Sequence, residues 1–175
     1  KHMKLQKSLD AFLFCCYAGM RYSDFTNLSK KNIVDINQET WLIYKSVKTG
    51  TEVRLPLYLL FAGKGIVILN KYRNNLEDFF RLRDNSNINK DLIIIAKLAG
   101  LSKKISFHTA RHTNATLLIY NGVNITTVQK LLGHKSVKTT QVYTNIMDMT
   151  IVHDLEKIKQ AALGIKKKTD NSFNK

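Results

Sequence analysis

The sequence lacks the features that mark a membrane-spanning or a disulfide-rich chain. No apolar run approaches the ~20 residues that a helix needs to span a bilayer, and no charged-then-apolar signal opens the chain. The two cysteines, Cys15 and Cys16, are adjacent and lie in an apolar stretch, which argues against a disulfide framework. We therefore predict buried free thiols in a reducing compartment.

Acidic residues and proline are also scarce. Asp and Glu number 13 against 28 Lys and Arg, which gives a formal net charge of +15. This excess favours a polyanionic partner, nucleic acid ahead of a membrane surface, over the simpler alternative of a solvated basic face. The single proline, Pro56, ends a predicted strand, where a missing N–H is tolerated. With 175 residues, 44% of them apolar, the chain can form one domain with its own core.

Apolar periodicity predicts a mainly α fold with a small antiparallel β-sheet, the α+β class. Ser23 is expected to cap a short second helix. The first helix is expected to bury Leu5, Leu9, Phe12, Leu13 and Cys16. Strands are predicted over residues 33–36, 41–47 and 52–57, with a hairpin turn at 48–51. Further helices are predicted over residues 58–74, 87–101, 106–122, 125–132, 137–145 and 149–163, with a loop over 83–89.

Two short motifs in the first third of the chain hold cationic side chains in places where they could bind a ligand. Gly19-Met20-Arg21 puts an arginine at a helix–helix junction, where it could point into a cleft or pair with Asp24. Lys48 lies in the predicted hairpin turn, before the strand that ends at Pro56. Most turn lysines are simply solvated, so Lys48 needs support from elsewhere in the sequence.

Two more motifs follow in the second half. His108-Thr-Ala-Arg111-His112 places His108 and Arg111 on one face of a helix. Leu-Gly-His134 precedes Tyr143 by nine residues, with basic and hydroxyl side chains between them. A tyrosine hydroxyl beside cationic donors is a plausible nucleophile toward a phosphodiester. Taken alone, Tyr143 is better explained as a core tyrosine than as a nucleophile.

In order and spacing, the four motifs resemble those of the tyrosine recombinase catalytic domain, the phage integrase family, over roughly residues 5–160. One departure is Asn145, which stands where many members have histidine. The resemblance implies a catalytic domain over residues 1–164. It implies the catalytic residues Arg21, Lys48, His108, Arg111, His134 and Tyr143.

The chemistry gives each residue type a reason. Tyr143 would attack the scissile phosphate, form a 3′-phosphotyrosyl link and release a 5′-hydroxyl. The two arginines and His134 would donate hydrogen bonds to the nonbridging oxygens. His108 is expected to be the general base and Lys48 the general acid. Because the covalent link conserves the bond energy, neither a metal nor ATP nor another cofactor is expected.

The resemblance also implies partners. They are double-stranded DNA, a homotetramer held through the helix at 149–163, and accessory DNA-bending factors; packing of that helix in cis is equally compatible. The expected location is the bacterial cytoplasm, on DNA. Lys1-His2-Met3 is typical of a cloning remnant, so we expect a fragment without the family's N-terminal DNA-clamping domain. Residues 165–175 are expected to be a flexible basic tail.

Three other interpretations remain open at this point. His108 and His112, four apart on a helix, could ligate zinc, although Arg111 would place a positive charge beside the metal. Residues 124–143 could be a helix-turn-helix of a non-catalytic DNA-binding protein. A type IB topoisomerase would use the same chemistry on one duplex.

Overall fold

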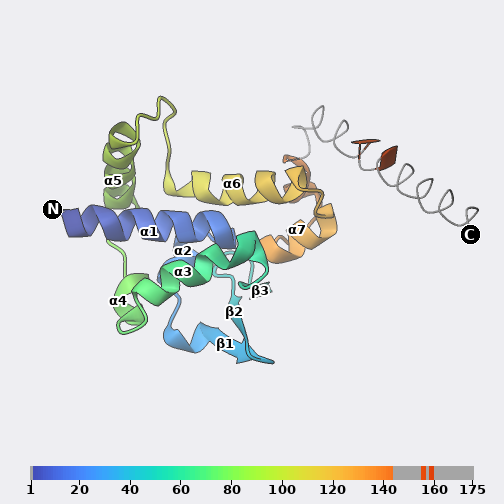
Figure 1. The fold of residues 1–175 in the computed structure, drawn as a ribbon, viewed down its shortest axis with the longest axis horizontal. Coiled ribbons are helices and arrows are strands. Elements are labelled where there is room, and N and C mark those ends of the chain that lie inside the picture. Colours follow the sequence, from blue (N-terminus) through green and yellow to red (C-terminus); the bar gives the residue numbers. More distant parts are fainter. Residues whose placement is uncertain (1, 144–154, 157, 160–175) are drawn as a thin grey trace, which may run out of the picture.

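Most of the chain is helical, and a three-stranded sheet lies at one side of the helices (Figure 1). The computed structural model describes residues 2–143, 155–156 and 158–159. The elements are α1 (His2–Ala18), α2 (Tyr22–Thr26), η1 (Lys30–Asn32), β1 (Ile33–Ile36), β2 (Glu39–Lys45), β3 (Glu52–Pro56), η2 (Leu60–Gly63), α3 (Lys64–Lys71), α4 (Leu76–Phe80), α5 (Asn85–Leu98), α6 (Phe107–Tyr120), α7 (Ile125–Leu132) and α8 (Lys138–Gln141).

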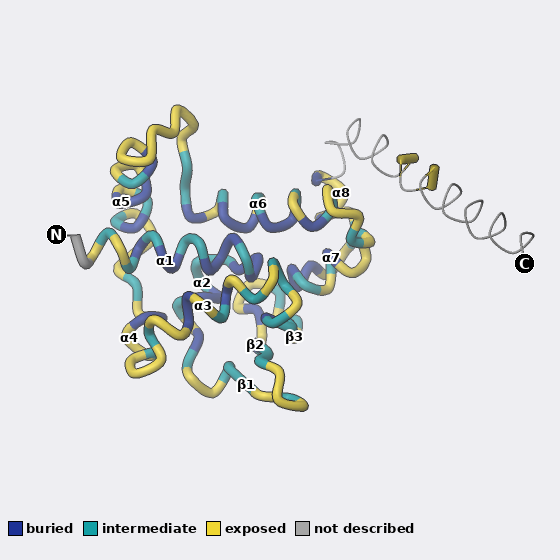
Figure 2. The backbone as a smooth tube through the Cα atoms, viewed as in Figure 1, coloured by how far each residue is buried: buried dark blue, intermediate teal, exposed yellow. Residues whose placement is uncertain are grey.

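Helix α1 is the central element, because α3, α5 and α6 all pack against it. Figure 2 shows the buried side of α6 facing α1. The predicted apolar face of α1 was only partly correct. Cys16 is buried and Phe12 and Leu13 pack partly buried against the core, but the most enclosed residues are Ala11, Phe14, Cys15 and Ala18. A helix covered from several directions has no single apolar stripe, so periodicity misplaces its face.

The two cysteines are free and buried, as predicted. Burial raises the pKa of the Cys16 thiol to about 12, and that of Cys15 also well above its usual range. Neither side chain is therefore a thiolate at neutral pH.

An aromatic cluster joins α1, α2, α4 and α6. The ring of Phe25 lies 5.9 Å from that of Phe14, 5.3 Å from Phe79, 5.5 Å from Phe80 and 6.3 Å from Phe107, measured between centroids. Pairs of this kind contribute about 0.5–1.5 kcal/mol each beyond their buried area. They anchor α2 in the core, and with it the start of α6.

The predicted sheet is confirmed, with strand order β1-β2-β3 and both pairs antiparallel. Trp41 lies opposite Pro56 and Lys45 opposite Glu52, so the β2–β3 hairpin turns through residues 46–51. Gly50 has a φ of +67°, which this turn requires and most residues avoid. Within residues 2–143, 155–156 and 158–159, no helix is long and apolar enough to cross a membrane.

The helix boundaries differ from prediction in several places. Arg21, not Ser23, is the N-cap of α2. The segment 58–74 is not one helix, because Phe61 and Ala62, inside η2, have left-handed backbone angles and α3 begins only after them. Helix α4 was not predicted, and α5 begins inside the predicted loop. The predicted helix at 149–163, apart from residues 155–156 and 158–159, and the tail at 165–175 lie outside the described residues.

Candidate active site

Arg111 is the centre of the site. Its side chain is almost fully buried, yet Nη1 donates to the carbonyl of Gly19 at 2.8 Å and Nη2 to that of Leu132 at 2.7 Å. These bonds join the end of α1 to the end of α7. Burial and the neighbouring Arg21 lower the pKa of Arg111 to about 10, so the guanidinium stays charged at neutral pH.

Arg21 lies at the junction of α1 and α2, as predicted, and both of its expected roles are compatible with the geometry. Its Nη1 donates to the Ser46 hydroxyl at 3.3 Å and lies 3.6 Å from an Asp24 carboxylate oxygen. The positive charge of Arg21 also contributes to lowering the pKa of Arg111 and of His134. Its guanidinium therefore lies among the other candidate residues rather than on a separate face.

The buried carboxylate of Asp24 holds the hairpin in place, a role that the sequence did not reveal. It accepts from the backbone N–H of Val47 at 2.8 Å and from the Ser46 hydroxyl at 3.3 Å. On the other side of the turn, the Thr49 hydroxyl donates to the Gly133 carbonyl at 3.0 Å. The exposed Lys48 thus stands on a turn that is tethered at both sides.

His108 lies in the first turn of α6, whose N-cap is Ser106. Burial lowers the pKa of His108, and the charges of His112, Arg111, Arg21 and Lys48 lower it further, so the ring is neutral at neutral pH. The contribution of Lys48 shows that the hairpin turn and the start of α6 share one electrostatic environment.

His112 was named as the end of the His108–His112 motif and as a possible zinc ligand, and the structure places it between His108 and Tyr143. The His112 ring centroid lies 4.4 Å from that of His108 and 5.4 Å from that of Tyr143, edge-on in both pairs. Its place in the motif and its i,i+4 spacing from His108 were the signs in the sequence. The part of the chain that the structure describes holds no group of three His, Cys, Asp or Glu side chains able to bind a metal.

His134 follows Gly133, the left-handed residue that ends α7. Its Nδ1 lies 2.9 Å from the hydroxyl of the fully buried Thr140. Burial, helped by the charges of Arg111 and Arg21, lowers the pKa of His134 to about 4. The imidazole is therefore neutral at neutral pH.

Tyr143 follows α8 in a turn, whereas the sequence predicted it within a helix. Its ring is 7% exposed and belongs to a small apolar cluster with Leu118, Val128 and Leu132. Burial raises the pKa of Tyr143, and the charges of Arg111 and Arg21 oppose that rise only in part. The hydroxyl is therefore protonated at neutral pH and needs a proton acceptor before it can attack.

Close backbone packing explains the two glycines of the motifs. A Cβ on Gly133 would lie 2.6 Å from a methyl of Val53, and one on Gly19 would lie 2.6 Å from Asn114 Oδ1. Both glycines also have positive φ angles. The backbone next to Arg21 is thereby brought against α6, and the backbone next to His134 against the sheet.

A buried hydroxyl without a hydrogen bond lies near the site. Tyr44, on β2, is 5% exposed, and its hydroxyl has no partner among the described residues. Burial raises its pKa; Asp24 raises it further, while Arg111 and Arg21 lower it.

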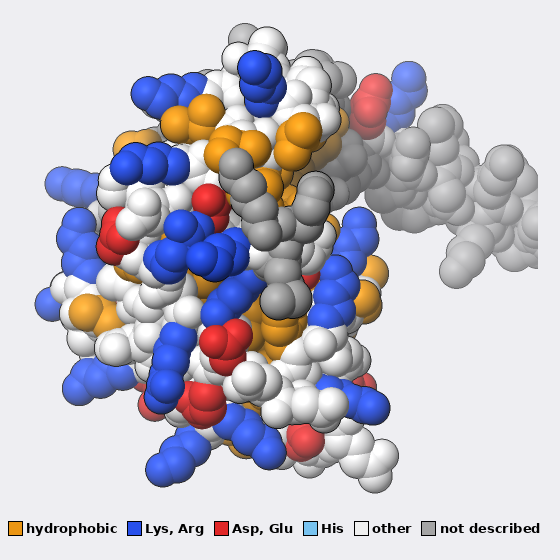
Figure 3. Space-filling view, turned by 90° about the vertical axis from the view of Figure 1, so that its left-hand side faces the viewer, with side chains coloured by type: hydrophobic (Ala, Val, Ile, Leu, Met, Phe, Trp, Pro, Cys, Tyr) orange, Lys and Arg blue, Asp and Glu red, His pale blue; other side chains and the backbone are white. Residues whose placement is uncertain are grey.

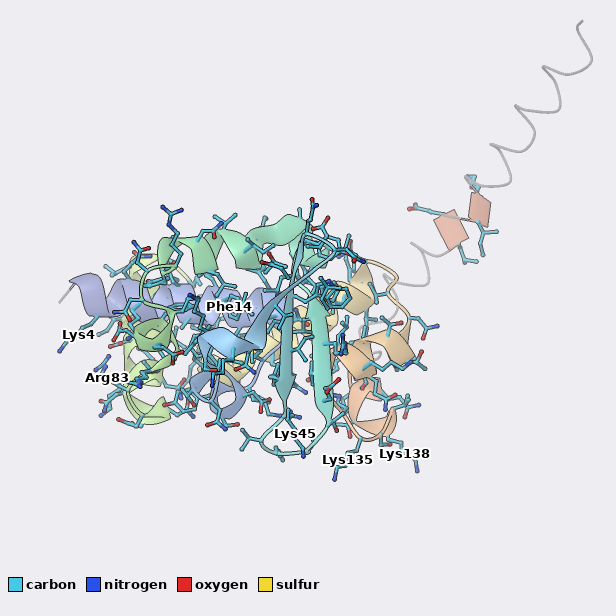
Figure 4. The ribbon with its side chains drawn as sticks, turned by 90° about the horizontal axis from the view of Figure 1, so that it is seen from below. Lys4, Phe14, Lys45, Arg83, Lys135 and Lys138 are labelled. Carbon is cyan, nitrogen blue, oxygen red and sulfur yellow. The ribbon has the colours of Figure 1, made fainter. Side chains whose placement is uncertain are left out.

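Exposed lysines surround the site. Lys45 and Lys48 stand on the hairpin, Lys135 lies between α7 and α8, and Lys138 is the first residue of α8. In Figure 4, Lys45, Lys135 and Lys138 project along one edge of the molecule. Helix α8 has only four residues, which is short for the recognition helix of a helix-turn-helix.

The chain belongs to the phage integrase family, whose family model matches residues 3–149. Tyrosine recombinase XerC of Rickettsia prowazekii (strain Madrid E) is 30% identical over 159 residues, 86% of this chain and 49% of the relative. The chain therefore spans about half the length of this curated relative.

Solved structures agree with this assignment. The crystal structure of XerA recombinase superimposes with a TM-score of 0.66 at 25% identity, over 87% of this chain and 62% of that one. A lambda integrase tetramer bound to a Holliday junction gives a TM-score of 0.64 at 21% identity, over 78% of this chain and 42% of that one. The fold is that of a tyrosine recombinase catalytic domain, which confirms the predicted α+β class.

Proposed function

We propose that this chain is the catalytic domain of a site-specific DNA recombinase that breaks and rejoins strands through a 3′-phosphotyrosyl intermediate at Tyr143. The observation that carries the proposal is the convergence of Arg21, Arg111 and His134 close to Tyr143. The charges of both arginines affect the pKa values of His134 and Tyr143. Together the two guanidinium groups give a positive potential beside a neutral phenol, which favours attack on a phosphodiester.

The scissile phosphate would be held by donors on its nonbridging oxygens. Arg111 uses only part of its N–H groups on the Gly19 and Leu132 carbonyls, so others remain for a phosphate. If His134 Nδ1 accepts from Thr140, the proton resides on Nε2, which becomes a neutral donor. Preorganised donors of this kind are typically worth about 3 kcal/mol each in the transition state.

Proton transfers complete the reaction. Tyr143 would form the O–P bond as its phenolic proton passes to a neutral histidine, and the bond from phosphorus to the 5′-oxygen would break as that oxygen takes a proton from Lys48. His108 is the proposed base. His112 is a second candidate, because its ring centroid lies 5.4 Å from that of Tyr143. Religation reverses these steps and needs neither ATP nor metal.

The decisive experiment incubates the chain with a nicked suicide duplex and resolves the products on a denaturing gel, with EDTA present and ATP omitted. Wild type should leave a covalent protein–DNA band. Tyr143→Phe should lose the band while keeping DNA affinity. Tyr44→Phe is the matched control, because it removes a buried hydroxyl nearby and should retain the band. A covalent band from Tyr143→Phe would refute the nucleophile; no band from wild type would favour a non-catalytic binder.

Variants of the other residues separate their roles. His108→Gln and His112→Gln should differ, with the larger loss of adduct marking the base. Lys48→Ala should lose cleavage on an ordinary 5′-oxygen leaving group and recover it on a 5′-thio leaving group, which needs no acid. Full activity of Lys48→Ala would move the acid to Lys45.

The assembled enzyme would act on double-stranded DNA in the bacterial cytoplasm, as four copies on two duplexes, with accessory DNA-bending proteins. The formal charge of +15 and the lysines around the site support DNA as the partner. The segment 149–163 is the proposed contact between copies. Crosslinking on a Holliday junction, with and without residues after 148, tests that contact.

A further inference from the structure

A second basic feature lies away from the candidate catalytic residues, between the start of α1 and the segment that joins α4 to α5. It is a pocket of about 180 Å³. Its lining residues are Lys4, Lys7, Ser8, Arg81, Leu82, Arg83 and Ile88. Four of these seven side chains carry a positive charge, so the pocket is suited to an anion.

Only two of these four cationic side chains pair with a carboxylate. Lys7 pairs with Asp78 at 2.9 Å, and Arg83 pairs with Asp91. Lys4 and Arg81 are exposed, and neither has an acidic partner in the described part of the chain. Two cations at one pocket therefore remain available for a ligand.

The walls of the pocket are held by contacts that do not involve a ligand. The Asp91 carboxylate, which holds Arg83, also accepts from the buried Ser8 hydroxyl at 2.5 Å. The Tyr22 hydroxyl donates to the Arg83 carbonyl at 2.5 Å, and Ile88 is buried below. An anion would thus bind a surface whose backbone is already ordered, which lowers the entropic cost of binding.

The pocket shares an edge of the molecule with the candidate active site. Figure 4 shows Lys4, Arg83, Lys45, Lys135 and Lys138 following one another along that edge. Figure 3, which looks at the N-terminal end, shows many Lys and Arg side chains over this face, with acidic side chains interspersed among them. A duplex that extends from the hairpin toward α1 would bring its phosphates to the pocket.

We infer that this pocket is a second phosphate site, in which Lys4 and Arg81 bind the backbone of the same duplex at a distance from the scissile phosphate. The inference rests on the proposed function, because it takes DNA as the substrate. A contact of this type carries no sequence information; it fixes the direction and register of the duplex on the protein.

The test measures DNA affinity between 50 and 200 mM salt by fluorescence anisotropy for wild type, Arg81→Gln and Lys4→Gln. Each lost phosphate contact should lower the salt slope by about 0.9, so the change in affinity over this range should shrink about 3.5-fold. Lys64→Gln is the control, since Lys64 is exposed on α3, which Figure 4 draws along the opposite edge. Its slope should equal that of wild type.

Duplex length gives a second measurement. On duplexes shortened from the α1 side until the pocket is uncovered, Arg81→Gln should bind like wild type. Unchanged slopes for Arg81→Gln and Lys4→Gln overturn the second site even if the Tyr143 adduct forms. If inorganic phosphate binds the pocket while the salt slopes of DNA binding are unchanged, the pocket is instead a site for a small free anion. Reduced slopes without any adduct would support the site and refute the catalytic proposal.

Discussion

The Nδ1 atom of His134 lies 2.9 Å from the hydroxyl oxygen of Thr140, and both residues are buried. The contact spans the segment between α7 and α8, so it fixes the ring relative to the following turn. The backbone of His134 is held as well, since its N–H donates to the Gln129 carbonyl and its carbonyl accepts from Gln129 Nε2, both at 3.0 Å. A neutral histidine held this way presents its Nε2 in one orientation.

We therefore expect Thr140→Val to slow adduct formation on the suicide substrate about tenfold, below the hundredfold typical for loss of a whole oxyanion donor. The valine fills the same space but leaves Nδ1 without its partner, so the imidazole can rotate or change tautomer. Thr140→Ser keeps the hydroxyl and should restore most of the rate. DNA affinity should stay unchanged in both variants. Equal rates for the valine and serine variants would show that the contact does not orient His134.

Stability should depend on pH through His134. Its folded pKa of about 4 lies below the unfolded value of about 6.5, so the unfolded chain binds the proton more readily. The contribution is complete above pH 6.5 and is lost as the pH falls toward 4. Between pH 7.5 and 5.5 the loss should be about 1.4 kcal/mol in the free energy of unfolding.

Urea unfolding of wild type and His134→Gln at these two pH values measures this loss. Because the pKa of His108 is also lowered by burial and by its cationic neighbours, part of the decline should persist in the variant. Wild type should lose about 1.4 kcal/mol more than His134→Gln over the same interval. Parallel losses in both proteins would contradict a buried neutral His134.

The types and order of the six candidate residues could be read from the sequence, because the four motifs resemble those of the family; their roles stay a prediction. What holds them in place could not. Thr139 and Thr140 are neighbours of the same type, yet Thr139 is exposed and Thr140 fully buried. Asp24 was predicted only as a possible partner of Arg21, whereas it also binds the hairpin. Such contacts join residues far apart in sequence, and local patterns carry no record of them.

The fold shows the same division. The starts of α6 and α7 and the end of α7 at Leu132 follow from local chemistry, and the predicted bounds 106 and 125–132 are confirmed to within one residue. The buried face of α1 depends on which helices surround it, so apolar periodicity alone could not predict which residues are buried. The break at Phe61 depends on left-handed backbone angles at a residue type that rarely adopts them.

Replacing Gly133 by alanine should destabilise the domain and displace His134. The new Cβ would meet Val53 at 2.6 Å, and the φ of +62° is itself unfavourable for alanine. We expect a loss of about 2–4 kcal/mol, of which the backbone angle accounts for about 1–2 and the clash for the rest.

Gly100→Ala separates these two causes. Gly100 has a φ of +68° but nothing lies within 4 Å of the position of its Cβ. Its replacement should therefore cost only the backbone part, about 1–2 kcal/mol, and leave adduct formation intact. Equal unfolding energies for the two alanine variants would mean that the hairpin yields to the added methyl group.

Arg111 should prove structural as well as catalytic. Arg111→Ala would leave the buried Gly19 and Leu132 carbonyls without their donors, at about 1–3 kcal/mol for each unsatisfied group. Arg111→Lys keeps a charge, but a single ammonium cannot replace the planar guanidinium between both carbonyls and a phosphate. We expect it to lose about 2 kcal/mol of unfolding free energy together with the adduct.

Arg21→Lys is the comparison, because the partly exposed Arg21 side chain loses only its contacts with Ser46 and Asp24. It should stay within about 1 kcal/mol of wild type while cleavage falls. Chemical denaturation and the adduct assay, run on the same preparations, separate the two effects. If Arg111→Lys were as stable as Arg21→Lys, the bonds of Arg111 to Gly19 and Leu132 would be incidental, and its guanidinium would serve the phosphate alone.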